Sequence, residues 1–213
     1  MEHPLQSILI LVLGWLLGTL SPAIVDAIRS KREAALSREA VENELLELSA
    51  VLLPACYRTM GAVGKIDRAY LEWQKDKLEK EPEKEKLLRF LGLTKQLLAF
   101  PDDQIQAASQ AMATAETKAA LLQKYPIPLV DHCLASLKMF EVDFQSKILQ
   151  VRRNISLLES IVDQSREFYR LTFVELSDAN HKIIQDNLKQ TYSEYAERAK
   201  IIIDQVYALR PAG

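Results

Sequence analysis

The residues with the strongest metal-binding chemistry are few, and their spacing does not predict a site. Asp131, His132 and Cys133 are consecutive and offer oxygen, nitrogen and sulfur as ligand atoms. On a helix, however, neighbouring side chains point about 100° apart and do not converge on one tetrahedral ion. Cys56 and His181 are too far away in sequence to complete a set of ligands by spacing alone. We therefore expect no metal ion and no cofactor.

Catalytic motifs are equally scarce. The segment from Asp178 to His181 comes nearest to the Glu-x-x-His pattern of carboxylate-bridged metal bundles, but it lies at an expected helix start. The sequence has no glycine-rich phosphate loop, nucleophile elbow or His-Glu-x-x-His zinc motif. Cys133 falls on an apolar helical face, which is typical of a small core residue. These observations predict no catalytic residue, and a cryptic enzyme that depends on Cys133 or His132 is the weakest alternative.

The composition excludes two further classes of protein. The chain of 213 residues has 27 Lys and Arg against 29 Asp and Glu, for a formal net charge of -2. This balance excludes a basic nucleic-acid-binding protein, so we expect no nucleic acid among the partners. Two cysteines are too few for a disulfide scaffold.

A long uncharged segment near the N-terminus predicts a membrane anchor. Residues 1–4 form a short tail, and residues 5–25 contain no charged side chain. A helix over this segment is about 30 Å long, which matches the hydrocarbon core of a bilayer. The alternative is a cleaved signal peptide with its cleavage site at residues 25–27, after which the mature protein is exported.

Basic residues flank this segment on one side only. No Lys or Arg precedes it, whereas Arg29, Lys31, Arg32 and Arg38 follow it. Because cytoplasmic flanks of membrane helices carry an excess of Lys and Arg, this asymmetry favours an uncleaved, single-pass signal-anchor. We expect the N-terminus outside the membrane and residues 27–213 in the cytoplasm.

Small residues recur along one face of the expected membrane helix. Gly14 and Gly18 are one turn apart, and Ser21 continues the same face. Such a face allows a second helix to approach closely, so it indicates self-association or docking on another membrane helix. Glycine is also common in membrane helices that do not pair, and this second interpretation stays open.

The rest of the chain has the apolar periodicity of helices. Steps of three and four residues predict one long helix over residues 128–177 and another that follows it and ends by Pro211. Further helices are expected over about 26–58, after which Gly61 and Gly64 interrupt the chain, and over about 101–122. A helix over residues 128–177 would be about 75 Å long, which indicates a rod-like body or a break near residues 152–154.

These elements predict an all-α fold: a transmembrane helix followed by an antiparallel, partly elongated bundle of four or five helices. Residues 26–100 would form juxtamembrane helices with a charged loop near residues 75–89. Residues 101–213 would form the long-helix part of the same cytoplasmic domain. Apolar stripes left uncovered within one chain would be covered by a second copy or a partner helix, as in a coiled coil.

Four aromatic residues near the expected hairpin between the last two helices form a candidate apolar pocket: Phe168, Tyr169, Tyr192 and Tyr195. They either line a site for a lipid or small ligand or form the core of the hairpin, and the second interpretation is favoured. The sequence as a whole predicts a membrane-anchored scaffold or interaction protein, with the bilayer and a second copy or another protein as partners. A membrane-tethered bundle that senses a ligand or lipid is the alternative.

Overall fold

The structure is a computed structural model that describes residues 4–81, 84–115, 121–175 and 177–209. Most side chains between residues 4 and 23, and those of residues 84, 86 and 115, also lie outside the described part. Seven α-helices and one short 3-10 helix make up all the regular structure of the described residues. This confirms the all-α bundle, but the helices are more numerous than the four or five that the sequence predicted.

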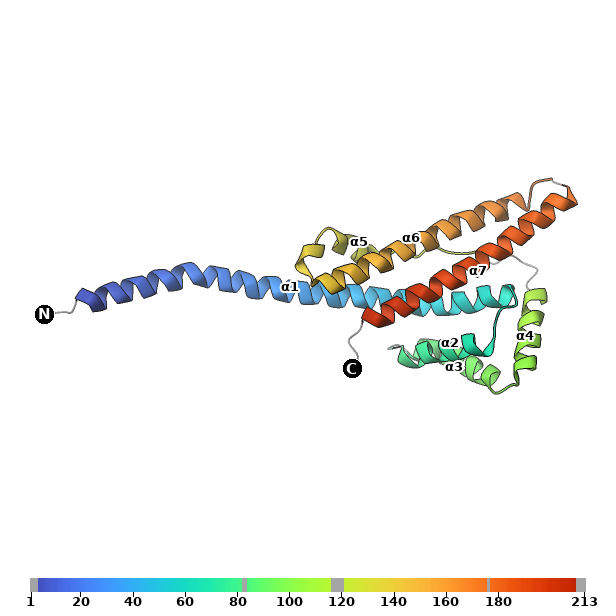
Figure 1. Ribbon diagram of the computed structural model, residues 1–213, viewed down its shortest axis with the longest axis horizontal. Coiled ribbons are helices and arrows are strands. Elements are labelled where there is room, and N and C mark those ends of the chain that lie inside the picture. Colours follow the sequence, from blue (N-terminus) through green and yellow to red (C-terminus); the bar gives the residue numbers. More distant parts are fainter. Residues whose placement is uncertain (1–3, 82–83, 116–120, 176, 210–213) are drawn as a thin grey trace.

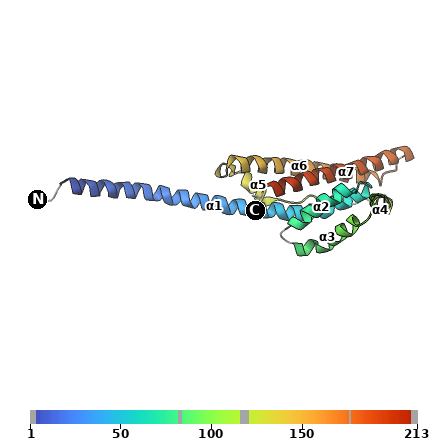
Figure 2. The same cartoon turned by 60° about the horizontal axis from the view of Figure 1, so that its bottom comes forward.

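The longest element, α1 (Pro4–Ala62), extends from the apolar N-terminal segment into the centre of the body (Figure 1). Its 59 residues form one helix, which corresponds to a length of about 90 Å. Residues 24–33 are exposed, whereas most residues from Val41 onward are buried. A second direction of view also places the N-terminal half of α1 beyond the body (Figure 2). We call residues 26–40 of α1 the stalk.

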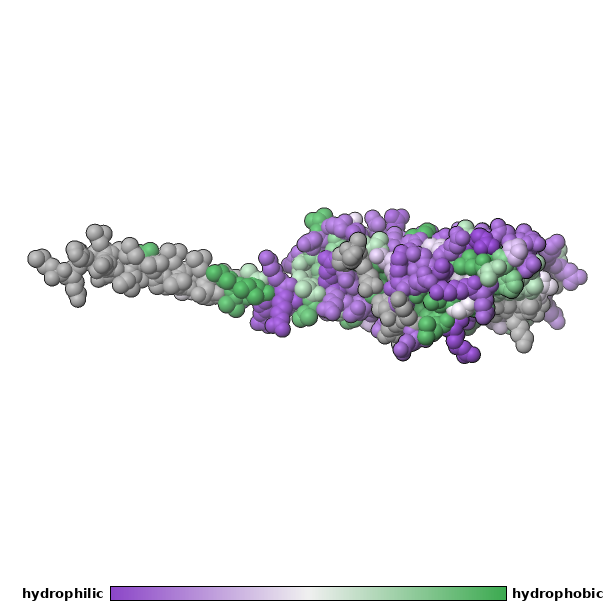
Figure 3. All heavy atoms as spheres, turned by 90° about the horizontal axis from the view of Figure 1, so that it is seen from below, coloured by the Kyte–Doolittle hydropathy of each residue, from purple (hydrophilic) through white to green (hydrophobic). Residues whose placement is uncertain are grey.

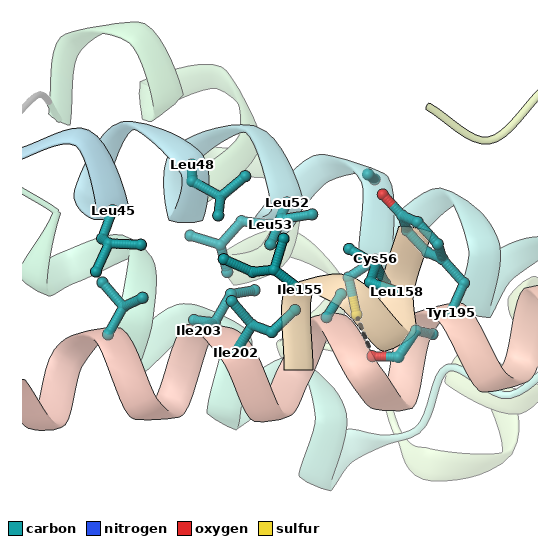
Figure 4. Close-up of a cluster of buried hydrophobic side chains, with 14 of the residues drawn as sticks. Leu45, Leu48, Leu52, Leu53, Cys56, Ile155, Leu158, Tyr195, Ile202 and Ile203 are labelled. Carbon is teal, nitrogen blue, oxygen red and sulfur yellow. Dashed lines mark hydrogen bonds between the residues drawn. The ribbon is translucent and has the colours of Figure 1, made fainter. Parts of the chain in front are cut away.

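The body is built on three long helices. α6 (Val142–Leu171) and α7 (Asp178–Leu209) form an antiparallel hairpin, and α7 packs against both α6 and the second half of α1. Apolar side chains every three or four residues on each helix meet in the middle, as expected for helix-on-helix packing. Fully buried members of this core are Leu45, Leu52 and Leu53 of α1 and Ile202 and Ile203 of α7 (Figure 4).

The expected helix over residues 128–177 is wrong, because the chain breaks before α6. The structure has α5 (Pro128–Leu134), the 3-10 helix η1 (Leu137–Met139) and then α6. Phe140 and Glu141 are extended between η1 and α6. A continuous helix would place Glu141 on the buried stripe between Leu137 and Phe144. The break instead leaves Glu141 exposed and buries Phe140 to 8% exposure.

The alternative break near residues 152–154 is also wrong, since α6 runs through them without interruption. Arg152 bonds to Asp131 of α5 at 2.7 Å. Asn154 donates to Gln205 of α7 at 2.9 Å, so this polar stretch joins helices together.

Three shorter helices cover another side of α1. They are α2 (Arg68–Lys80), α3 (Lys84–Leu98) and α4 (Asp102–Ala115). The charged segment 75–89 is therefore mostly the end of α2 and the start of α3. α4 begins where the sequence predicted but ends at Ala115, and residues 121–127 are not helical. The expected interruption after α1 is confirmed, because Gly64 adopts φ 68°, a conformation that glycine favours.

The packing of α7 can be tested with two adjacent isoleucines. Ile202 is 0% exposed and Ile201 is 42% exposed. We expect Ile202→Ala to lower the free energy of unfolding by about 2–5 kcal/mol, because it leaves a cavity between helices. Ile201→Ala is the matched control and should lower it by about 1 kcal/mol or less. Urea unfolding followed by circular dichroism measures both, and equal losses would contradict this placement of α7.

Candidate functional site

The N-terminal segment is helical throughout its described residues, from Pro4 into the stalk. Three small residues were expected to form a packing face. The surroundings of two of them, Gly14 and Ser21, lie outside the described part of the structure. Gly18 is exposed, and apart from its chain neighbours and the backbone of its own helix no described atom lies within 4 Å of the position that a Cβ atom would take there. Nothing in the described part of the chain covers Gly18, and its pairing with another helix stays a prediction.

Within the described residues, no helix is both long enough and apolar enough to span a bilayer. The space-filling view marks the apolar residues that are described near the end of the segment, before the charged stalk (Figure 3). Ile24 and Val25, at the end of the segment, are 56% and 61% exposed, and Ile28, at the start of the stalk, is 64% exposed.

The four basic residues that follow the segment fall into two groups. Arg29, Lys31 and Arg32 are exposed on the stalk, and Arg29 pairs with Glu33 at 2.9 Å. Arg38 lies closer to the body, where its guanidinium carbon stands 4.6 Å from the ring centroid of Phe144. Arg38 therefore attaches the stalk to α6, whereas the other three cations are free of the body.

The four aromatic residues of the candidate pocket also differ in burial. Tyr192 and Tyr195 are 5% and 1% exposed and belong to the core, where burial raises the pKa of Tyr195. Phe168 and Tyr169 are partly buried near the end of α6, and Tyr169 meets Phe173 edge-on with ring centroids 5.1 Å apart. Ligand binding by these four residues stays a prediction, and their burial supports the interpretation as core.

Both cysteines are buried free thiols. Cys56 donates to the carbonyl oxygen of Ala196 at 3.4 Å, which joins α1 to α7. Burial raises the pKa of Cys56 to about 11, and burial also raises the pKa of Cys133. A nucleophilic thiol needs a depressed pKa, so the environment of each cysteine is that of a structural residue. No cluster of metal-ligating side chains occurs among the residues that the structure describes.

The structure contains two features that sequence reasoning missed. One is a polar attachment of α2 to α7: the Trp73 indole donates to Asp204 at 2.9 Å, and Lys77 pairs with the same carboxylate at 2.8 Å. The other is a groove of about 360 Å³ where the stalk enters the body, between α1 and the α5–η1 segment. Glu44 of α1 fixes this segment by accepting from the first amides of α5, those of Leu129 and Val130, at 3.0 and 2.8 Å.

Neither feature has a strong local signal. The partners of Asp204 are more than a hundred residues away in the sequence. An aspartate on the polar face of α7 gives no indication of which residues it will bind. The groove depends on the break at residues 140–141. The conflict between the apolar stripe and Glu141 was the only available sign of that break.

No known protein family, no curated protein and no solved structure matches this chain. Its function therefore has to be argued from its own residues.

The buried thiol of Cys56 makes stability depend on pH. Its pKa of about 11 in the folded protein lies above the unfolded value of 9.0. Below pH 9 the thiol is neutral in both states, whereas from pH 9 to 11 only the unfolded chain ionises, which favours unfolding. Between pH 8 and pH 10.5, we expect the free energy of unfolding of the wild type to fall by about 2 kcal/mol more than that of Cys56→Ala. Urea unfolding at both pH values measures this.

Cys133→Ala is the matched control for this prediction, because tyrosine ionisation is common to all three proteins. Its free energy of unfolding should fall between the two pH values by nearly as much as that of the wild type. An identical pH dependence in the wild type and in Cys56→Ala would contradict the buried, neutral thiol.

Proposed function

We propose that the protein is a membrane-anchored helical scaffold, in which residues 5–25 span the bilayer and the body organises a partner at the membrane surface. One observation carries the proposal. α1 is an unbroken helix whose apolar end projects from the body and whose other end is the centre of the core. A partner bound to the body would therefore be held by the same helix that enters the membrane.

The physical support comes from the character of the projecting segment. Residues 5–25 have no charged side chain, and a helix that is apolar on all sides is stable only when it is buried. The body does not bury the described apolar residues where this segment meets the stalk, since Ile24, Val25 and Ile28 are all more than half exposed. A bilayer or a second apolar helix would supply the missing burial.

The scaffold role follows from confinement. Anchoring restricts the body to a layer next to the membrane and so raises its effective concentration for partners on the same membrane. The stalk, residues 26–40, would hold the body about 20 Å beyond the span. Gly14, Gly18 and Ser21 offer the face for a second copy or for another membrane helix within the bilayer.

The proposed orientation places the body in the cytoplasm and the N-terminus outside. It is supported by Arg29, Lys31 and Arg32, which are exposed on the stalk, whereas residues 1–4 contain no Lys or Arg. The competing topology is cleavage at residues 25–27 and export. Sequencing the N-terminus of the native protein separates the two, because an uncleaved anchor retains residues 1–26.

A second candidate function is a membrane-tethered bundle that binds a lipid or another ligand. The observation that favours it is the groove at the root of the stalk, rather than the aromatic residues that the sequence suggested.

The anchor is tested by introducing charge into its centre. We expect the wild-type chain to float with phosphatidylcholine vesicles and to resist alkaline extraction. The double variant Leu13→Arg, Leu16→Arg should remain in the soluble fraction, because each Arg at the bilayer centre costs about 3 kcal/mol or more.

Leu36→Arg is the matched control, since Leu36 lies on the stalk and is 58% exposed. This variant should float like the wild type. Alkaline extraction of the wild-type protein, or equal flotation of the double variant, would overturn the proposed anchor.

A further inference from the structure

The helices α2 and α3 form one antiparallel pair beside the second half of α1 (Figures 1 and 2). We call residues 68–80 and 84–98 the α2–α3 pair. The pair has a charged contact of its own, since Lys95 of α3 meets Glu79 of α2 at 2.8 Å. Its two helices are therefore bound to each other by a contact that does not involve the rest of the body.

The two connections of the α2–α3 pair to the rest of the chain lie at one corner. Arg68 begins α2, and its guanidinium donates to the carbonyl oxygens of Leu98 and Phe100 at 3.0 and 2.6 Å. Because Leu98 ends α3, Arg68 holds the entry and the exit of the pair together. Gly64, with φ 68°, lies just before this corner. Rotation about the connections there would move both helices as one unit without unwinding α1 or α4.

The contacts that hold the pair against α7 lie further along α2. Asp204 of α7 accepts from the Trp73 indole at 2.9 Å and pairs with Lys77 at 2.8 Å. The Tyr207 hydroxyl of α7 donates to the carbonyl oxygen of Lys77 at 3.1 Å. Lys77 is about 14 Å along the helix from Arg68. The attachment to α7 is therefore polar and lies at a distance from the corner about which the pair would turn.

The α2–α3 pair buries little apolar surface. The buried apolar side chains of α2 are Tyr70, Leu71 and Leu78, and the described part of α3 adds Leu87. By contrast, α7 buries apolar side chains over its whole length, from residue 184 to residue 209. Segments with few buried apolar contacts open at a lower free energy than the core of the same protein. The pair is therefore the part of the body that we expect to separate first.

A buried amide without partners makes the attached position of α2 less stable. Gln74 is fully buried, and neither its amide nitrogen nor its amide oxygen has a hydrogen-bond partner among the described residues. It lies on the same face of α2 as Tyr70 and Lys77, one turn from each, and this face meets α1 and α7. An amide in this state has lost its bonds to water without replacing them. Water would satisfy both atoms once α2 moves away, so Gln74 favours release of the pair.

We propose that the α2–α3 pair is a lid that opens from α1 and α7 about the corner at Arg68 while the helices of the core stay folded. Asp204 holds the lid closed, and the unsatisfied amide of Gln74 keeps the free energy of opening low. The open lid uncovers the face of α1 and α7 that carries Cys56. The proposed scaffold would thereby have a surface that is covered in one state and exposed in the other. This motion takes place in the body whether or not residues 5–25 span a bilayer.

Cys56 is a native probe of the lid. Its thiol is fully buried and donates to the carbonyl oxygen of Ala196 on α7 at 3.4 Å. Tyr70 of α2 lies beside it, and burial together with the neighbouring Cys56 raises the pKa of Tyr70. Opening of the lid removes this cover, so that a thiol reagent reaches Cys56 while α7 stays folded. The second cysteine, Cys133, lies on α5, which contacts α1 and α6.

The test measures the rate at which N-ethylmaleimide labels Cys56 in the full-length Cys133→Ala protein, kept in a mild detergent. We expect labelling in the absence of denaturant, at a rate that rises little with low concentrations of urea, because a local opening exposes little surface. A rate that rises as steeply with urea as global unfolding does, or labelling that begins only at global unfolding, would overturn the lid.

Two variants act on the lid in opposite directions. Asp204→Ala should speed the labelling of Cys56 about fivefold or more, because the Trp73 indole and Lys77 lose their acceptor. Gln74→Leu should slow it about tenfold or more, because the closed state no longer contains an unsatisfied amide. Gln74→Leu stabilises the closed state, so it tests the lid even if Asp204→Ala does not fold. Faster labelling in Gln74→Leu, or no change in either variant, would overturn the proposal.

Arg152→Gln is the matched control. Arg152 bonds to Asp131 at 2.7 Å and so joins α6 to α5, away from the lid. This variant weakens the body but should leave the labelling of Cys56 unchanged. An acceleration as large as that in Asp204→Ala would mean that labelling occurs through global unfolding, and the lid would be wrong.

Hydrogen exchange followed by mass spectrometry tests whether the two helices open together. A detached pair of short helices is marginally stable in water, so its amides exchange soon after opening. We expect peptides from residues 68–80 and 84–98 to share one free energy of opening, below that of residues 142–171 and 184–206. Asp204→Ala should lower this value in both helices and leave α6 unchanged. Exchange of α2 and α3 only together with α7 would overturn the lid.

Discussion

The burial of the second half of α1 is the interaction on which the rest of the body depends. Leu45, Leu52 and Leu53 are fully buried, and α7 covers them with an apolar face of its own. The α6–α7 hairpin alone would leave that face of α7 in water, and two antiparallel helices bury too little surface to be stable. The shorter helices also need α1, since the ring of Tyr57 on α1 meets Phe90 of α3 with centroids 5.2 Å apart. The body therefore assembles around one helix.

That same helix carries the apolar segment, which ties the core to the proposed anchor. No loop or turn separates the two parts within α1. In a chain with a flexible linker, an anchor limits only the distance of the body from the membrane. A continuous helix would also set its orientation: α5 lies at the end of the body nearest the N-terminal half of α1, and the tip of the α6–α7 hairpin lies at the far end. The proposed anchor and the core of the body thus belong to one element.

The sequence predicted the parts that depend on local pattern. The bounds of α7, the start of α4 at Asp102 and the turn at Gly64 follow from apolar periodicity, from acidic residues at a helix start and from the φ angles that glycine permits. The break at Phe140 and Glu141 was missed, because a single charged residue on an apolar stripe is often tolerated in a helix. Whether Glu141 stays in register or is expelled depends on the space that Phe140 finds against α1. Periodicity carries no information on that space.

The candidate sites divide in the same way. The basic residues of the stalk and the uncharged segment are visible in composition, and three of these basic residues, Arg29, Lys31 and Arg32, are exposed. Tyr192 and Tyr195 were grouped with Phe168 and Tyr169 by closeness across an expected hairpin, but their burial differs. The groove requires the relative placement of α1, α5 and η1, which Glu44 and the packing of Phe140 determine across long sequence separations.

The central claim is that α1 is one unbroken helix from the membrane into the core. It is tested most directly by the distance between spin labels at Ile28 and Arg58, measured by pulsed electron paramagnetic resonance in nanodiscs with both native cysteines replaced by alanine. Thirty residues of continuous helix predict a narrow distribution near about 45 Å. A broad distribution, or one centred well below this distance, would mean that the stalk bends or unfolds and would contradict the account.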